Sequence, residues 1–114
     1  MKIAIPLDEN KTSVCVSFGR APFFLFSENG KTEILENPAA KARGGAGIKA
    51  AQFILDQKAD TLITPRLGDN AAGVFKVAGT KIYKSEFESA AENVEACVAG
   101  KLSELTSFHE GFHA

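Results

Sequence analysis

Three arginines in this chain each lie within two residues of a glycine, a combination suited to binding anions. The pairs are, in chain order, Gly19 with Arg20, Arg43 with Gly44, and Arg66 with Gly68. A guanidinium group is permanently charged and offers five N–H donors in a fixed plane, so it forms charge-assisted hydrogen bonds to anions. Glycine has no Cβ, which lets a ligand approach the backbone closely. These pairs are therefore the first candidates for a binding site.

The segment of residues 61–72 joins one of these pairs to a predicted strand, turn and helix. An apolar, β-branched run ends at Pro65, and apolar residues recur at helical spacing from Ala71 onward. The first N–H groups of a helix have no partner within it, and the helix dipole makes this end positive. The turn is either half of an anion-binding site or an ordinary cap formed by Gly68 and Asp69. From this segment alone, the cap is the simpler interpretation.

Two cysteines, Cys15 and Cys97, are too few for a site in which thiolates alone hold a zinc ion or an iron–sulfur cluster. We expect both thiols to be reduced. Cys97 falls on the predicted inward face of the last helix, which favours a role in the core. Cys15 is either a thiolate ligand for a soft metal such as copper or a small buried residue, and the sequence does not decide between the two.

Two histidines, His109 and His113, lie near the end of the sequence with Glu110 between them. Their i, i+4 spacing would place both imidazoles on one side of a helix, where they can chelate a metal ion. Gly111 interrupts the segment and the chain end is close, so a frayed tail is the favoured interpretation.

The 114 residues carry a formal net charge of -1, and the sequence pI is about 6.1. Nucleic-acid-binding domains usually present a basic face, so we expect no nucleic-acid partner, and any cationic site must be local. Residues 1–6 are too short an apolar run for a signal peptide, and no later run reaches the length of a membrane span. We therefore expect a soluble, cytoplasmic protein, a monomer or weak dimer, with one domain of residues 1–105 and a tail of residues 106–114.

Hydrophobic patterning predicts five strands, at residues 3–5, 23–26, 32–36, 61–64 and 80–83. The first strand is expected to stop at Pro6, and residues 13–16 to pair back briefly. Asn29 and Gly30, between the second and third strands, are a strong hairpin signal because both tolerate positive φ.

Three helices are predicted between and after these strands. The first begins at Gly44 to Gly47 and ends near Lys58, with Ile48, Ala51 and Leu55 inward; the second runs from the Gly68 turn to Ala78. The third begins at a capping box, Ser85 with Glu88, and has an inward face of Phe87, Ala90, Val94, Cys97 and Val98. Residues 101–114 are expected to be an appendage.

The connections between these elements predict the strand order. The hairpin places the second strand beside the third, and the helical crossovers make the fourth and fifth strands parallel neighbours. Pairing of the second strand with the first then gives the order 3-2-1-4-5 with only strand two antiparallel, a ribonuclease H-like five-stranded α/β fold flanked by three helices. The three arginines and three helix N-termini then share one rim at the switch point between strands one and four, where open α/β sheets bind ligands. This convergence favours an anion site over simple capping.

Five short motifs appear in order along residues 1–105. They are Ile3-Ala4-Ile5-Pro6 with Asp8, Phe18-Gly19-Arg20-Ala21-Pro22-Phe23, Glu36-Asn37-Pro38, Gly45-Ala46-Gly47, and Gly68-Asp69-Asn70-Ala71. With these motifs the chain resembles the dinitrogenase iron–molybdenum cofactor biosynthesis family, which includes the NifX and NafY accessory domains, the carboxy-terminal domain of NifB, and the orange protein with its molybdenum–copper sulfide cluster. The resemblance implies a protein that binds or carries an anionic metal–sulfur cluster, either molybdenum–copper sulfide or an iron–molybdenum cofactor precursor.

The motifs and the predicted rim together give the candidate cluster-binding residues Ser17, Phe18, Gly19, Arg20, Gly45, Ala46, Gly47, Arg66, Leu67, Gly68 and Asn70. Family members often place a histidine, a plausible metal ligand, before the Phe-Gly-Arg motif, whereas this chain has Ser17. Either the cluster is held without that ligand, as in the orange-protein type, or Cys15 takes its place.

Two other classes of function remain open. Ribonuclease H-like folds include metal-dependent phosphodiester hydrolases, but these need several carboxylates, and Asp8 and Asp69 are the only acids expected on the rim. The other class is an interaction module without a cluster, such as an adaptor for a nucleotide-dependent ATPase. We expect a binding protein with no catalytic residues, whose partners donate or accept the cluster.

Overall fold

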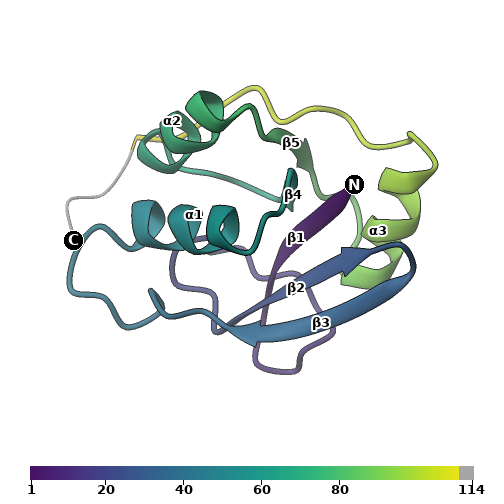
Figure 1. The fold of residues 1–114 in the computed structure, drawn as a ribbon, viewed down its shortest axis with the longest axis horizontal. Coiled ribbons are helices and arrows are strands. Elements are labelled where there is room, and N and C mark those ends of the chain that lie inside the picture. Colours follow the sequence, from purple (N-terminus) through teal and green to yellow (C-terminus); the bar gives the residue numbers. More distant parts are fainter. Residues whose placement is uncertain (111–114) are drawn as a thin grey trace.

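Five strands form one mixed sheet in the order β3-β2-β1-β4-β5 in the computed structural model, which describes residues 1–110 (Figure 1). The strands are β1 (Lys2–Leu7), β2 (Phe23–Glu28), β3 (Lys31–Glu36), β4 (Thr61–Thr64) and β5 (Lys81–Lys84). β2 is antiparallel to both of its neighbours, whereas β1, β4 and β5 are parallel. The predicted strand order and the single reversed strand are confirmed.

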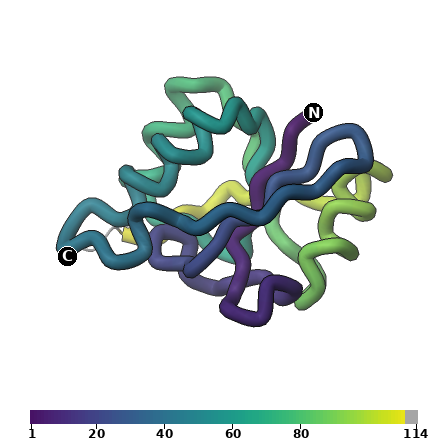
Figure 2. The backbone as a smooth tube through the Cα atoms, turned by 60° about the horizontal axis from the view of Figure 1, so that its bottom comes forward, coloured from purple at the N-terminus to yellow at the C-terminus, as the bar shows by residue number. Residues whose placement is uncertain are grey.

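Helices cover both faces of this sheet. They are α1 (Ala46–Asp56), α2 (Asp69–Ala78) and α3 (Ala90–Val98). α1 and α2 lie side by side on one face, and α3 packs on the other (Figures 1 and 2). Alternate residues of β1 point to the two layers: Ala4 packs with α1 and α2, while Ile3 and Ile5 pack with α3. Burial on both faces explains why every residue of this strand after Lys2 is apolar.

β1 continues through Pro6 to Leu7, so the predicted end at Pro6 is wrong. Proline has no backbone N–H, so it interrupts a strand only where the neighbouring strand would accept a hydrogen bond from that group. β4 pairs with β1 only at Ile3 and Ala4, and the Pro6 carbonyl accepts a hydrogen bond from the Cys15 N–H at 2.9 Å. The predicted return arm is confirmed by a bridge from Val14 to Leu7.

The β2–β3 hairpin turns at Asn29 and Gly30, as predicted. Their φ angles are 51° and 78°, the left-handed values that a tight hairpin turn requires. β3 is the open edge of the sheet, and most of its residues are exposed.

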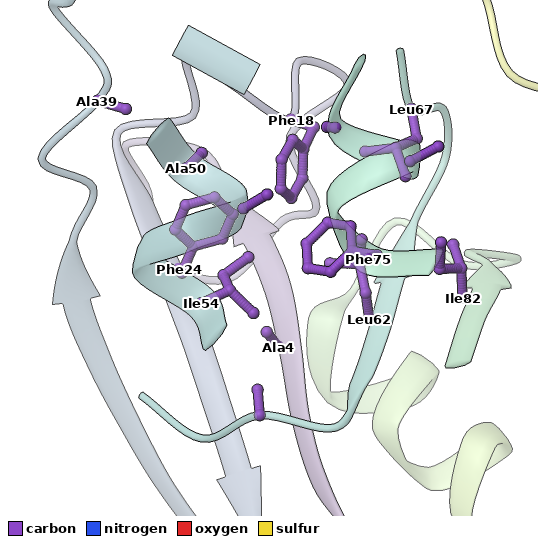
Figure 3. Close-up of a cluster of buried hydrophobic side chains, with 14 of the residues drawn as sticks. Ala4, Phe18, Phe24, Ala39, Ala50, Ile54, Leu62, Leu67, Phe75 and Ile82 are labelled. Atoms are coloured by element: carbon purple, nitrogen blue, oxygen red, sulfur yellow. The ribbon is translucent and has the colours of Figure 1, made fainter. Parts of the chain in front are cut away.

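Three phenylalanines lie at the centre of the core between the sheet and helices α1 and α2 (Figure 3). The ring centroid of Phe18 is 5.5 Å from that of Phe24 and 5.8 Å from that of Phe75. Phe18 belongs to the loop after β1, so packing in the core fixes the position of that loop.

The inward face of α1 differs from the prediction at one residue. Ala51 is buried as expected, but Ile48 is 37% exposed, and the buried positions are Ala46, Ala50, Ala51 and Ile54. A Cβ added at Gly47 would lie 3.6 Å from the Ala71 Cβ, so α1 meets α2 through small residues. At about 100° per residue, the four buried positions share one side of the helix, and Ile48 falls outside it.

The capping box predicted at Ser85 is wrong, because α3 begins after Ser89, whose side chain accepts a hydrogen bond from the Glu92 N–H. The preceding loop is instead held by Asn93, which is fully buried and bonds the backbone of Glu86, Phe87 and Ser89. With the helix start moved, two of the predicted inward residues are exposed, Phe87 at 44% and Val98 at 70%. The predicted burial of Ala90 and Cys97 is confirmed.

The segment after α3 packs against the domain, so its description as an appendage is wrong up to Glu110. Leu102 is buried, and a bridge joins Glu104 to Tyr83 on β5. Further along, the Lys76 ammonium lies 4.8 Å from the centre of the Phe108 ring. We call residues 102–110 the strap. The boundary expected at residue 105 stays a prediction. Within residues 1–110, no helix has the length and apolarity needed to cross a membrane.

Candidate functional site

A crevice of about 370 Å³ opens between the loop after β1, the N-terminus of α1 and the β4–α2 turn. These three segments come from distant parts of the sequence and meet where β1 and β4 end. All predicted cluster-binding residues except Leu67 line this crevice. Its volume is within the range of small-ligand pockets, about 300–1,000 Å³.

The loop of residues 17–20 lies directly on the first turn of α1. A Cβ at Gly19 would be only 2.8 Å from the backbone N of Gly47 and 3.0 Å from its Cα, so no other residue fits without moving the backbone. Phe18 anchors the loop to the core from the opposite side. The loop therefore forms a fixed wall of the crevice.

Arg20 and Arg66 supply the permanent positive charges of the crevice, and both side chains are exposed. The Arg20 Nη1 donates to the carbonyl oxygens of Ala42 at 2.8 Å and Ala40 at 3.5 Å, which fixes the direction of its side chain. Within the part of the chain that the structure describes, Arg66 has no ion-pair or side-chain hydrogen-bond partner. Its charge is thus available to a ligand.

Two helix N-termini line the crevice with their first-turn residues. The N-cap residues are Gly45, in the left-handed conformation at φ 67°, and Gly68, and no side chain of residues 1–110 caps either helix. For residues 1–110, no acceptor is found for the N–H groups of Ala46 and Gly47 in α1 or Asn70 and Ala71 in α2. Such groups, with the positive end of the helix dipole, form an anion-binding surface. Among the described residues, no Asp or Glu lines the crevice.

A family model for the dinitrogenase iron-molybdenum cofactor matches residues 1–100. The chain belongs to this family. An uncharacterized protein of Methanocaldococcus jannaschii is 35% identical in an alignment 110 residues long that covers 92% of each chain. The apo orange protein of Desulfovibrio gigas has a TM-score of 0.84 and 25% identity, with 93% of each chain covered. A NifB-type protein of Thermotoga has a TM-score of 0.77 and 33% identity, covering 97% of this chain and 98% of its own.

Membership of the dinitrogenase iron–molybdenum cofactor family associates the chain with biosynthesis of that cofactor or with carriers that bind metal–sulfur clusters. The family is a cofactor-binding or carrier type and not a known class of enzyme. The crevice geometry is compatible with this role because it combines fixed charge with backbone donors.

Two parts of the predicted rim lie away from the crevice. Arg43 does not line the crevice, and the N-terminus of α3 lies on the opposite face of the sheet. The sequence predicted three arginines and three helix N-termini at this site. Among the described residues, the crevice is lined by two of each. Leu67 is fully buried, so its side chain packs in the core.

Cys15, for which the sequence left a metal ligand or a buried residue open, is buried at 8% exposure and does not line the crevice. Burial, followed by a hydrogen bond to Asp8, raises the pKa of the Cys15 thiol to about 11. Burial also raises the pKa of Cys97, which lies under α3. Both cysteines are therefore protonated at neutral pH and are poor metal ligands in this state.

The sequence did not identify three crevice residues, Val16, Ile48 and Ala71, and it placed His109 in a frayed tail. The strap instead pairs with the β4–α2 turn: the His109 N–H donates to the Leu67 carbonyl, and the Asp69 N–H donates to the His109 carbonyl at 2.9 Å. The His109 ring lies over Gly68, where an added Cβ would be 3.3 Å from Cε1. The only sequence signal for this contact is the three-residue spacing of Leu102, Leu105 and Phe108.

The chelating pair of His109 and His113 stays a prediction, since His113 lies outside the described residues. Within residues 1–110, no group of three or more His, Cys, Asp or Glu side chains is placed to hold a metal ion.

Proposed function

We propose that this protein binds and carries an anionic metal–sulfide cluster in the crevice, and that charge and backbone donors hold the cluster. The observation that supports the proposal most strongly is the convergence of Arg20, Arg66 and two uncapped helix N-termini on one cavity without a lining carboxylate among residues 1–110. A polyanion gains from each of these groups, whereas a cation is repelled by them.

The state of the cysteines supports electrostatic capture over thiolate ligation. A conventional iron–sulfur cluster takes four thiolates, and this chain has two cysteines. Both are buried, and the high pKa of Cys15 keeps its thiol protonated. The cargo must therefore bring its own sulfide ligands.

The resemblance to the orange protein makes molybdenum–copper sulfide the first cargo to test. The likeness to that protein extends over 93% of each chain. An iron–molybdenum cofactor precursor is the second, since the family model and the NifB-type neighbour both point to cofactor biosynthesis. As a carrier, the protein would exchange its cargo with donor and acceptor proteins.

The alternatives have less support from the geometry. A phosphodiester hydrolase with two metal ions needs several carboxylates around one site. Asp8 is hydrogen-bonded to Cys15, outside the crevice lining, and no carboxylate of the described residues joins Arg20 and Arg66 there. An adaptor without cargo has no need for helix ends and an arginine that find no side-chain partner among the described residues.

Anaerobic titration of the folded apo-protein with tetrathiomolybdate and copper(I) tests the proposal. We expect new charge-transfer bands that saturate at one cluster per chain and survive in the C15S variant, because the thiol is not a ligand. Bands no different from those of the free ions would contradict molybdenum–copper cargo and make an iron-containing precursor the next ligand to test. Loss of the complex in C15S would instead support a thiolate anchor.

A further inference from the structure

Asn37 is a buried polar residue beneath the loop that carries Arg20. Its side chain is 5% exposed, and its amide nitrogen donates to the Gly19 carbonyl at 3.0 Å and the Ala21 carbonyl at 2.9 Å. These two carbonyls flank Arg20 on both sides. A buried amide that loses a hydrogen-bond partner is left unsatisfied, which costs free energy. The Asn37 amide and the two carbonyls therefore hold one another in place.

The same asparagine also organises the turn that receives the Arg20 guanidinium. The Asn37 Oδ1 accepts from the Ala39 N–H at 2.9 Å. The backbone carbonyl of Asn37 accepts from the Ala40 N–H at 3.2 Å. The carbonyls of Ala40 and Ala42 then accept from the Arg20 Nη1. Asn37 thus bonds the backbone on both sides of Arg20 through its side chain, and its Oδ1 and backbone carbonyl together bond the turn whose carbonyls accept from the guanidinium.

The position of this loop relative to α1 is also constrained. Gly19, whose carbonyl Asn37 holds, lies so close to Gly47 that a Cβ would clash with the backbone of α1. A shift of this loop would therefore move Arg20 relative to the first-turn N–H groups of α1. A long arginine side chain that is ordered before binding also loses less conformational entropy when the ligand arrives.

We propose that Asn37 is a positioning residue, which holds Arg20 in the geometry that binds the anionic cargo. This inference rests on the proposed function of the crevice. Asn37 touches no ligand itself, and it acts through Arg20.

A double-mutant cycle with N37S and R20Q, measured by anaerobic equilibrium dialysis of tetrathiomolybdate, tests the proposal. We expect each single variant to lower the affinity about tenfold, as for loss of one charged hydrogen bond. The double variant should bind about as weakly as R20Q alone, because Asn37 then has no arginine to position. A loss of about a hundredfold, the product of two independent effects, would overturn the proposal.

Asn93 provides a matched control. It is also fully buried, bonds the backbone of a loop through its side chain, and lies with α3 on the other face of the sheet. N93S should lose stability as N37S does but keep the wild-type affinity. Equal losses of affinity in N37S and N93S would show that both act through general destabilisation.

If N37S does not fold, a second variant, G19A, tests whether the loop positions Arg20. G19A places a Cβ against the backbone of Gly47 and must displace the same loop while the buried amide stays intact. Its affinity loss should be non-additive with R20Q, and wild-type affinity in G19A would contradict the positioning role.

The state of Arg20 in the apo-protein separates failure of this proposal from failure of the proposed function. Nitrogen-15 relaxation should show an ordered Arg20 Nε in the wild type and a mobile one in N37S or G19A. Absence of tetrathiomolybdate binding with an ordered Arg20 would refute the cargo but not the positioning. An Arg20 that is mobile in the wild type would overturn the positioning itself.

Discussion

Arg20 and Arg66 contribute to the crevice in different ways because, within residues 1–110, Arg20 is tied to backbone carbonyls and Arg66 is not. Arg20 presents a fixed charge next to α1. Arg66, without a partner among the described residues, can turn toward whatever enters beside α2. A bound anion therefore meets one rigid and one adaptable guanidinium.

Replacing Arg66 with glutamate should lower the affinity for tetrathiomolybdate about tenfold or more, because a charged contact of about 1.5–3 kcal/mol is lost and repulsion is added. The affinity of the wild type should also weaken as salt rises. Arg43 is an exposed arginine that does not line the crevice, so R43E is the matched control. An equal loss in R43E would mean that net charge, and not the crevice, determines binding. Equilibrium dialysis at several salt concentrations gives both results.

Both cysteines should react slowly with a maleimide in the native protein, because each is buried and has a raised pKa. The thiolate is the reactive form, so the rate at Cys15 should increase as the pH rises toward about 11. Asp8 stabilises the protonated thiol, and D8N should therefore lower the pKa of Cys15 and speed its labelling at neutral pH. Mass spectrometry of labelled protein measures both rates. Rapid labelling of Cys15 at neutral pH would place it at the surface after all.

At the scale of elements, α3 is stabilised at its N-terminus by Ser89 and not by Ser85. S89A should lower the free energy of unfolding by about 1 kcal/mol, the usual cost of losing an N-cap hydrogen bond. S85A, the control, should change it by less than about 0.5 kcal/mol. Urea denaturation compares the two variants. The opposite ranking would restore the capping box predicted from the sequence.

The strap is held near the crevice by Phe108, which packs on the core and lies beneath the Lys76 ammonium. Removing this ring in F108A should loosen the backbone pairing between His109 and the β4–α2 turn. Hydrogen exchange at the Asp69 amide, which donates to His109, should then become about tenfold faster or more. T106A, an exposed position on the same segment, is the control. Unchanged protection at Asp69 would mean that Phe108 does not hold the strap.

For the whole molecule, local signals were enough to predict the sheet. The Asn29-Gly30 turn and the βαβ connections determine which strands are neighbours, and these signals act within short stretches of sequence. The glycine turns at Gly19, Gly45 and Gly68 meet as predicted because the topology brings them to one edge.

The features that the sequence did not predict depend on contacts between distant segments. Ile48 is exposed because α1 turns the side that carries Ala50 and Ile54 toward the core, and α3 starts late because Asn93 holds the preceding loop. His109 reaches Gly68 only through the course of the strap, which has no regular pattern of its own. Burial of Cys15 likewise depends on its pairing with Pro6 and its contact with Asp8.

The position of molybdenum in crystals of the loaded protein tests the central claim most directly. After anaerobic loading with tetrathiomolybdate and copper(I), an anomalous difference map at the molybdenum absorption edge should show its strongest peak between Arg20, Arg66 and the N-termini of α1 and α2. A peak at Cys97, or at the opposite face beside α3, would contradict the assignment of the crevice as the cluster-binding site.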